Sequence, residues 1–238
     1  MRSFTAGEKI LDAKAVAARK AVELVLDGMT IGLGSGTTAT FAIQFIGERI
    51  RAEGLKVTGV PTSSGTNSLA SEVGIPLVPL KHARFIDITI DGADEVDPDL
   101  HLIKGGGGAL VREKLVAAAS KEVVIICDDS KIKPVLGQFP LPVTVVPFGW
   151  EATRERLLAF CPEVVLRMKK GSSDVFVTDD GALILDLHMS SIPSPAVLEA
   201  GIKAVTGVIE VGLFVNLATS VVIGHTDGTT NILVRAVR

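Results

Sequence analysis

The chain has 238 residues and a formal net charge of −3; 47% of its residues are hydrophobic and only 4% are aromatic. This length allows one large domain, or one domain with a smaller companion, around a core of aliphatic side chains. The slightly negative charge argues against nucleic acid as a partner, and no run of roughly 18 uncharged apolar residues exists to cross a membrane.

Strand-like and helix-like segments alternate along the first part of the chain. In chain order we expect a helix over 6–26, a strand over 29–33, a helix over 38–52, a strand over 56–60, a helix over 64–72, a strand over 85–90, a helix over 109–120 and a strand over 123–127. This alternation predicts an α/β fold with a doubly wound, mostly parallel sheet.

The pattern changes after prolines at 134, 140 and 142. There we expect a strand over 143–146, a helix over 150–160, strands over 164–168, 175–178 and 183–187 with a turn at Asp180-Gly181, and a helix over 195–205 with Ser194 as its N-cap. Strands expected over 210–214, 221–223 and 232–234 return to the first sheet. Residues 1–133 with 208–238 are therefore expected to form the main domain, and 134–207 an α+β lid or oligomerisation domain.

The first polar segment follows a predicted strand and opens a predicted helix. It contains Gly34, Ser35, Gly36, Thr37 and Thr38, which offer backbone N–H groups and hydroxyls at a helix N-terminus. Such a loop suits a phosphate group, although a capped, tight strand–helix turn is the simpler alternative. A nicotinamide dinucleotide is disfavoured because Thr37 stands where the third glycine of that fingerprint would fall, and no Gly-Lys-Ser/Thr closes a Walker loop.

The second polar segment runs through Asp91, Gly92, Ala93, Asp94 and Glu95. Because Asp91 directly follows an apolar run, it lies at the carboxyl end of a strand, where ligands bind in open α/β sheets. The carboxylates suit acid–base chemistry, and an acidic surface loop is the alternative.

The third polar segment places Lys104 before the four glycines of 105–108. Four glycines lose much backbone entropy on folding, so close approach of the backbone to a ligand explains them better than a plain linker. Side chains of a helix tilt toward its N-terminus, so Glu113 is expected to point back toward the glycines and Lys104. A solvated helix face over 112–114 remains the alternative.

None of these segments has the spacing of a metal site. A calcium loop carries acids at alternate positions, whereas Asp91 and Asp94 are three apart. The four histidines lack ligand spacing: His82, His101, His188 and His225. We expect no metal and no cofactor.

Two features favour a cytoplasmic protein. Charged residues are spread through 1–27, so that segment lacks the apolar core of a signal peptide. Cys127 and Cys161 lie in apolar surroundings and do not form a metal-spaced pair, which is typical of reduced thiols in a reducing compartment.

Five motifs, in order, resemble the family of ribose-5-phosphate isomerases of type A nearly from end to end. They are Gly34-Ser35-Gly36-Thr37-Thr38, Asp91-Gly92-Ala93-Asp94-Glu95, Lys104-Gly105-Gly106-Gly107 with Arg112-Glu113-Lys114, Asp129-Ser130-Lys131, and Phe139-Pro140-Leu141-Pro142-Val143. The resemblance implies a Rossmann-like sheet domain with a small α+β, ferredoxin-like domain, assembled as a homodimer or homotetramer. It also implies an isomerase of the pentose phosphate pathway that interconverts D-ribose 5-phosphate and D-ribulose 5-phosphate through an enediolate, without metal or cofactor.

The resemblance also implies roles for individual residues. Glu113 matches the catalytic base, Lys104 the group that stabilises the enediolate, and Asp91 and Asp94 the carboxylates that hold sugar hydroxyls and assist ring opening. Lys14 and Lys131 add positive charge for the phosphate, although Lys14 also fits a plain surface lysine. The substrate-binding set it implies is Lys14, Ser35, Gly36, Thr37, Thr38, Asp91, Gly92, Ala93, Asp94, Lys104, Gly105, Gly106, Gly107 and Lys131.

Two other classes share a related fold. Glucosamine-6-phosphate deaminases and CoA transferases form one, but a deaminase-like site requires a catalytic histidine near its acids, and His101 does not lie in such a motif. Sugar-phosphate-sensing transcription regulators form the other. They require a DNA-binding module ahead of the first strand, and the first strand is expected here as early as residue 29.

Overall fold

The computed structural model describes residues 11–83 and 85–235. At its centre lies a six-stranded sheet in the order β13-β12-β6-β3-β1-β2, in which every strand is parallel to its neighbours except the edge strand β13. The strands are β1 (Thr30–Leu33), β2 (Thr58–Pro61), β3 (Ile86–Gly92), β6 (Ser120–Asp128), β12 (Ser220–Gly224) and β13 (Thr230–Val234).

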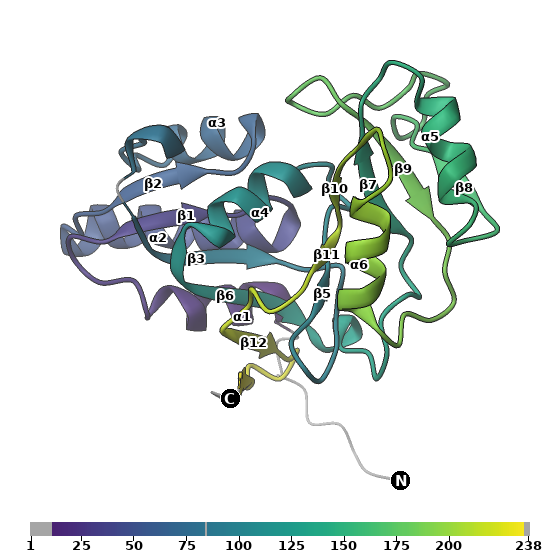
Figure 1. The fold of residues 1–238 in the computed structure, drawn as a ribbon. Helices are drawn as coiled ribbons and strands as arrows, with labels where there is room; N and C mark the ends of the chain where they lie inside the picture. Colours follow the sequence, from purple (N-terminus) through teal and green to yellow (C-terminus); the bar gives the residue numbers. More distant parts are fainter. Residues whose placement is uncertain (1–10, 84, 236–238) are drawn as a thin grey trace, which may run out of the picture.

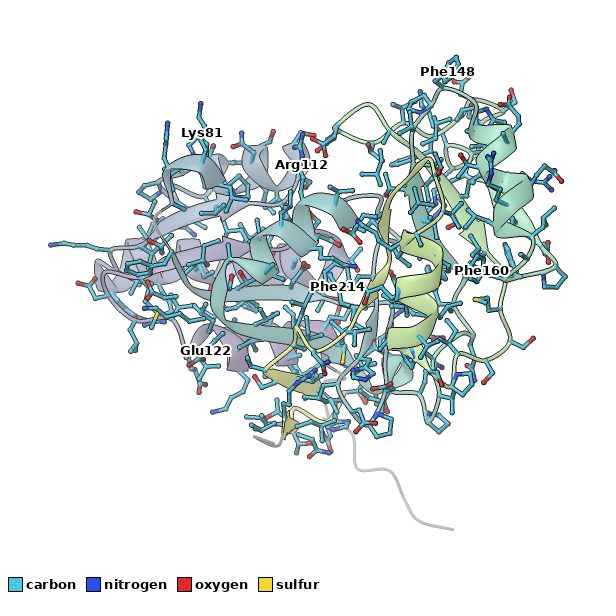
Figure 2. The ribbon with its side chains drawn as sticks, viewed as in Figure 1. Lys81, Arg112, Glu122, Phe148, Phe160 and Phe214 are labelled. Carbon is cyan, nitrogen blue, oxygen red and sulfur yellow. The ribbon has the colours of Figure 1, made fainter. Side chains whose placement is uncertain are left out.

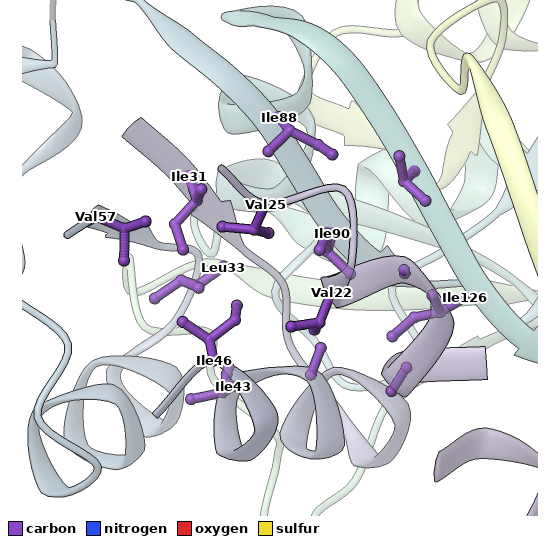
Figure 3. Packing of buried hydrophobic residues seen from close by; sticks show 14 of the residues in the cluster. Val22, Val25, Ile31, Leu33, Ile43, Ile46, Val57, Ile88, Ile90 and Ile126 are labelled. Atoms are coloured by element: carbon purple, nitrogen blue, oxygen red, sulfur yellow. The ribbon is translucent and has the colours of Figure 1, made fainter. Parts of the chain in front are cut away.

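Helices cover both faces of this sheet (Figure 1). They are α1 (Ala13–Val22), α2 (Thr37–Glu53), α3 (Ser64–Glu72) and α4 (Leu110–Ala118), with short 3₁₀ turns η1 (Leu80–His82) and η2 (Asp129–Lys131). Alternate residues of β6 serve the two faces: Val124 and Ile126 join the core under α1 and α2, while Val123 and Ile125 pack with Leu110 of α4. The aliphatic side chains of the first core interlock closely (Figure 3). Burial on both faces is what a parallel sheet requires.

Capping residues fix the helix boundaries. Ser63 accepts a hydrogen bond from the Thr66 N–H at 3.0 Å, so α3 begins where the sequence predicted. Gly54 ends α2 with a φ of 70°, a left-handed conformation that suits glycine. Asp12 caps α1, which ends at Val22, so the helix expected over 6–26 is four residues shorter at its C-terminal end than predicted; residues 6–10 lie outside the described residues.

A second sheet lies beside the first (Figure 1). It is antiparallel, in the order β10-β7-β9-β8, and two helices accompany it. Its elements are β7 (Leu141–Val145), α5 (Trp150–Leu157), β8 (Val164–Leu166), β9 (Leu183–Leu187), α6 (Pro195–Lys203) and β10 (Val208–Val211). The βαββαβ succession is that of a ferredoxin-like unit, so the predicted fold class is confirmed. Its core is aliphatic, with Leu141, Val143 and Leu185 fully buried.

A small three-stranded sheet joins the two units. Its strands are β4 (Glu95–Val96), β5 (Leu102–Ile103) and β11 (Leu213–Phe214), in the order β11-β5-β4. Strands of two residues leave no periodic pattern in a sequence, so none was predicted at 95–96 or 102–103.

Two expectations about strands are wrong. Residues 175–178 do not form a strand but make single bridges from Val175 to Met168 and from Val177 to Leu183. The strand expected over 210–214 divides at Gly212, where a Cβ atom would lie 2.4 Å from the carbonyl oxygen of Lys104. The chain therefore leaves the second sheet at Gly212 and enters the small one.

The division into two domains remains a proposal, with one boundary corrected. Since β10 pairs with β7, residues 208–211 belong with the second sheet rather than with the first domain. We therefore call 134–211 the second domain and the rest of the described chain the first domain. Within the described residues, no helix combines the length and apolar character needed to span a membrane.

Candidate active site

A polar cavity of about 110 Å³ opens at the carboxyl ends of β1 and β3. Its lining includes every candidate site residue except Asp91, and it is formed by Lys14, Ser35, Gly36, Thr37, Thr38, Gly92, Ala93, Asp94, Lys104, Gly105, Gly106, Gly107, Glu113 and Lys131. The fold thus brings together segments that are far apart in the sequence. Its hydroxyl, carboxylate and ammonium groups suit a compact hydrophilic ligand.

One end of the cavity is built for an anion. Gly36 is the N-cap of α2 with a φ of 91°, and no side chain caps this helix, so its first amide groups face the cavity without a side-chain acceptor. The Nζ atom of Lys14 lies 3.4 Å from Thr37 Oγ1, and Lys131 lines the same cavity. A helix N-terminus flanked by two ammonium groups is a phosphate-type site.

The Ser35 hydroxyl joins a cluster of hydroxyl groups beneath this loop. It lies 2.7 Å from Thr62 Oγ1 and 2.9 Å from Ser63 Oγ, and Thr66 is also within hydrogen-bond distance. Ser35 therefore fixes the loop as well as lining the cavity. The supporting residues 62–66 were missed in the sequence, although their run of hydroxyls directly after β2 points to the same sheet edge.

Three buried charged side chains lie at the base of the cavity, with Lys104 and Glu113 in its lining and Asp91 beneath it. Asp91, Lys104 and Glu113 are 2%, 4% and 4% exposed, respectively. Lys104 Nζ lies 2.9 Å from Asp91 Oδ2 and 3.3 Å from Glu113 Oε2, and it donates a 2.6 Å hydrogen bond to the Gly92 carbonyl. Glu113 therefore belongs to the site and not to a solvated helix face.

Asp91 lies under the cavity rather than in its lining. One of its carboxylate oxygens accepts hydrogen bonds from the N–H groups of Gly92 at 2.7 Å and Ser35 at 3.1 Å, and the other pairs with Lys104. In this structure Asp91 links the phosphate-type loop to Lys104 and holds both in place.

Burial raises the pKa of Glu113 to about 8, the ammonium of Lys104 opposes this rise, and the charge of Asp91 adds to it. Asp91 and Lys104 together are neutral, so an ionised Glu113 leaves one net negative charge in a buried site. Among the described residues, no donor forms a well-aligned hydrogen bond to Glu113 Oε2. A carboxylate without such a donor, with a pKa near neutrality, is suited to accept a proton.

Asp94 is held by the glycine loop. Its Oδ2 accepts a 2.8 Å hydrogen bond from the Gly106 N–H. A Cβ atom at position 106 would lie 2.6 Å from Asp94 Oδ1 and 2.9 Å from the Phe139 ring, which explains why this position is glycine. The loop thus approaches the carboxylate as closely as its backbone allows.

Glu95 supports the site from behind. Its buried carboxylate accepts hydrogen bonds from the Gly137 N–H at 2.7 Å and the Phe139 N–H at 2.6 Å. It therefore connects the acidic segment to the segment before β7, which the sequence could not reveal. Across residues 11–83 and 85–235, no group of three or more His, Cys, Asp or Glu side chains is arranged to hold a metal ion.

Comparisons with known proteins show the family of this chain. The family model for ribose 5-phosphate isomerase A (phosphoriboisomerase A) matches residues 58–228. A protein named ribose-5-phosphate isomerase A from Bradyrhizobium diazoefficiens is 50% identical over 224 residues, covering 90% of this chain and 92% of that protein. The corresponding protein of Ruegeria sp. (strain TM1040) is 47% identical, covering 92% of this chain and 86% of that protein.

Solved structures give the same result for the fold. The ribose 5-phosphate isomerase from Plasmodium falciparum has a TM-score of 0.90 at 39% identity, covering 94% of this chain and 99% of that chain. A D-ribose-5-phosphate isomerase in complex with phospho-erythronic acid also has a TM-score of 0.90, at 36% identity, covering 94% of this chain and 98% of that chain. With sequence relatives and structural neighbours that match almost its whole length, the chain belongs to the ribose-5-phosphate isomerase A family.

Proposed function

We propose that this chain interconverts D-ribose 5-phosphate and D-ribulose 5-phosphate through an enediolate, as a step of the pentose phosphate pathway. The observation that carries this proposal is the pairing of a buried carboxylate and a buried ammonium, Glu113 and Lys104, in a cavity whose other end is a phosphate-type helix N-terminus. The related structure that contains phospho-erythronic acid supports it, since that compound carries a phosphate group and hydroxyl groups, as the proposed substrate does.

Glu113 is proposed as the base that moves the proton between C2 and C1. A single carboxylate between two adjacent carbons can take a proton from one and return it to the other. Its raised pKa, about 8, makes the ionised form a stronger base than an ordinary glutamate.

Lys104 is proposed to stabilise the enediolate oxygen. An ammonium has three donors, and here two of them serve Asp91 and the Gly92 carbonyl. The third faces Glu113 at 3.3 Å, without the geometry of a hydrogen bond to it. This donor can therefore turn to a substrate oxygen while the other two keep the ammonium in place.

Asp94 is proposed to contact the sugar hydroxyls and to assist ring opening, because the substrate is largely a closed furanose. Its Oδ2 accepts a hydrogen bond from the Gly106 N–H, and Asp94 lines the cavity, so Oδ1 remains available to a ligand. Asp91 is proposed to act with it, by fixing Lys104 and the loop at 34–38.

The phosphate site gives a prediction about binding. We expect Thr37→Val to raise KM about tenfold with little change in kcat, because the hydroxyl lies at the phosphate end and its loss weakens mainly ground-state binding. Steady-state kinetics with ribose 5-phosphate measure this. The matched control is Thr40→Val on the same helix, whose hydroxyl bonds the Gly36 carbonyl and does not line the cavity. A thousandfold loss of kcat with KM unchanged would show that the loop is catalytic.

The proposed function itself is tested with purified protein and ribose 5-phosphate. We expect ketose to form, and we expect the rate to survive dialysis against a strong chelator, because the described residues supply no cluster of metal ligands. Colorimetric detection of ketose before and after dialysis measures both. No ketose from folded protein would refute the proposed reaction, and chelator loss restored by magnesium or zinc would refute the metal-free mechanism.

We also propose a cytoplasmic homodimer or homotetramer. Cys127 and Cys161 are unpaired and buried, which supports a reducing compartment. Phe148 is 93% exposed and Val234 on the edge strand β13 is 73% exposed, and a second copy would remove such side chains from water. Sedimentation equilibrium measures the number of copies.

A further inference from the structure

We propose that Arg167 of the second domain is a positioning residue for the reaction, which it serves by fixing the glycine loop and, through that loop, the carboxylate of Asp94. The inference rests on the proposed function and adds a residue from outside the five sequence motifs. It also gives the second domain a part in the chemistry that is separate from a lid or an oligomer interface.

The Arg167 side chain is itself held rigidly. Its guanidinium forms a two-point ion pair with Asp186 of β9, including a 2.8 Å hydrogen bond from Nε to Oδ2. Both side chains are mostly buried, at 13% and 16% exposure. A planar guanidinium paired in this way has a fixed orientation, so its remaining N–H groups point in fixed directions.

Those remaining donors reach across to the first domain. Arg167 Nη1 donates to the Gly105 carbonyl at 2.7 Å and lies 3.3 Å from the Gly106 carbonyl. Both glycines line the active-site cavity. A loop of consecutive glycines has little conformational preference of its own, so an external anchor is needed to select one conformation.

One peptide unit transmits this anchoring to Asp94. The Gly105 carbonyl and the Gly106 N–H belong to the same planar peptide group. Arg167 binds the oxygen of that group, and Asp94 Oδ2 accepts from its N–H at 2.8 Å. The plane therefore cannot rotate without breaking one of the two bonds, and Asp94 depends on Arg167 for its orientation.

Neighbouring contacts show that the second domain also packs on Gly108 and on α4. A Cβ atom on Gly108 would lie 2.4 Å from the Phe176 ring, so the ring packs directly on the loop. Arg112, next to Glu113, pairs with Asp180 at 2.7 Å and Asp179 at 3.2 Å, at the point where a loop of the second domain approaches α4 (Figure 2). The placement of Arg167 is thus one part of a continuous interface.

The test compares Arg167→Met with the wild type. We expect kcat to fall at least about tenfold, the scale of losing a hydrogen bond from a charged group. The inhibition constant of inorganic phosphate is expected to stay within about twofold, because the phosphate end of the cavity does not contact Arg167. Arg167→Lys keeps the charge but loses the planar fork that pairs with Asp186 while donating to the Gly105 carbonyl, so the kcat of Arg167→Lys is expected to lie between those of Arg167→Met and the wild type. Equal kcat in Arg167→Met and wild type would overturn the proposal.

Arg154→Met is the matched control. Arg154 also belongs to the second domain and donates to a backbone carbonyl, that of Val164 at 2.8 Å, but Val164 does not line the cavity, whereas Gly105 does. Its kcat is expected to equal that of the wild type. Circular dichroism and thermal melting check that each variant is folded, and if Arg167→Met does not fold, Arg167→Lys supplies the measurement.

A double-mutant cycle separates positioning of Asp94 from a general structural defect. In an Asp94→Asn background, Arg167→Met is expected to lower kcat by less than about threefold, because the group it positions is already impaired. A second full tenfold loss would overturn the proposal. If the folded wild type shows no isomerase activity, the proposed function is refuted, and the inference about Arg167 is tested by ligand binding instead. Calorimetry is then expected to show that Arg167→Met binds phospho-erythronate about tenfold more weakly than the wild type. Equal binding would overturn the inference.

Discussion

Replacing Glu113 with glutamine is expected to lower kcat by at least about 10²-fold, since general-base contributions run to roughly 10²–10⁴-fold. Glutamine keeps the shape of the side chain but cannot accept the proton. Substrate is still expected to bind, because the α2 N-terminus, Lys14 and Lys131 are unchanged. Steady-state kinetics measure the loss, and Glu122→Gln on the exposed part of β6 is the matched control with normal activity (Figure 2).

Two further measurements check that the effect is chemical. In heavy water, the variant is expected to incorporate deuterium into the sugar far more slowly than the wild type. The variant is also expected to be at least as stable as the wild type above pH 8. Because the folded pKa of Glu113 is raised above the ordinary 4.5, its favourable contribution to stability exists at low pH and is lost as the pH rises through about 8. A folded variant with more than about a tenth of the wild-type kcat would contradict the assignment of the base.

Replacing Lys104 with methionine is expected to lower kcat by about 10²–10³-fold, the scale for loss of one oxyanion-stabilising donor. Methionine has a similar length but no charge, so Asp91 and Glu113 face each other without the ammonium between them. Lys121→Met is the control, because that lysine pairs with Asp87 in an exposed position. A loss of less than about threefold would show that Lys104 is structural only.

The pH profile gives this variant a specific signature. A base must be ionised in the free enzyme, so kcat/KM of the wild type is expected to rise with pH through about 8. Lys104 lowers the pKa of Glu113, so its removal is expected to move that rise to higher pH. An unchanged midpoint in Lys104→Met would show that the titrating group is not Glu113.

Local sequence signals predicted the elements that local interactions determine. The helix over 64–72 was predicted with its observed bounds from its position before Gly74, and the structure shows that Ser63 caps its start. The strand over 183–187 was also predicted correctly, since the Asp180-Gly181 turn fixes where it begins, with Gly181 at a φ of 77°. The segment at 175–178 was mispredicted because its Phe176 packs on Gly108, a contact that no local pattern contains.

The site shows the same division between local and distant information. Glycine, acid and lysine motifs mark the cavity because each motif follows a strand, and the strands of a parallel sheet end at one edge. Residues that act through tertiary contact leave no such mark. Arg167 reaches Gly105 across 62 positions, and Glu95 reaches Gly137 across 42, so only the folded chain reveals them.

At Gly212 the chain passes from the second sheet to the small sheet, and this passage makes the active site depend on segments from both domains. The Lys104 N–H donates to the Gly212 carbonyl at 2.8 Å, and the Gly212 N–H donates to the Pro142 carbonyl at 2.7 Å. The strand that carries the chain back toward the large sheet therefore anchors the backbone of the lysine at the centre of the chemistry. A fragment ending at 133 would contain Asp91, Lys104 and Glu113 but neither Gly212 nor Arg167, so the smallest unit that can be transplanted with its chemistry intact extends beyond the second domain.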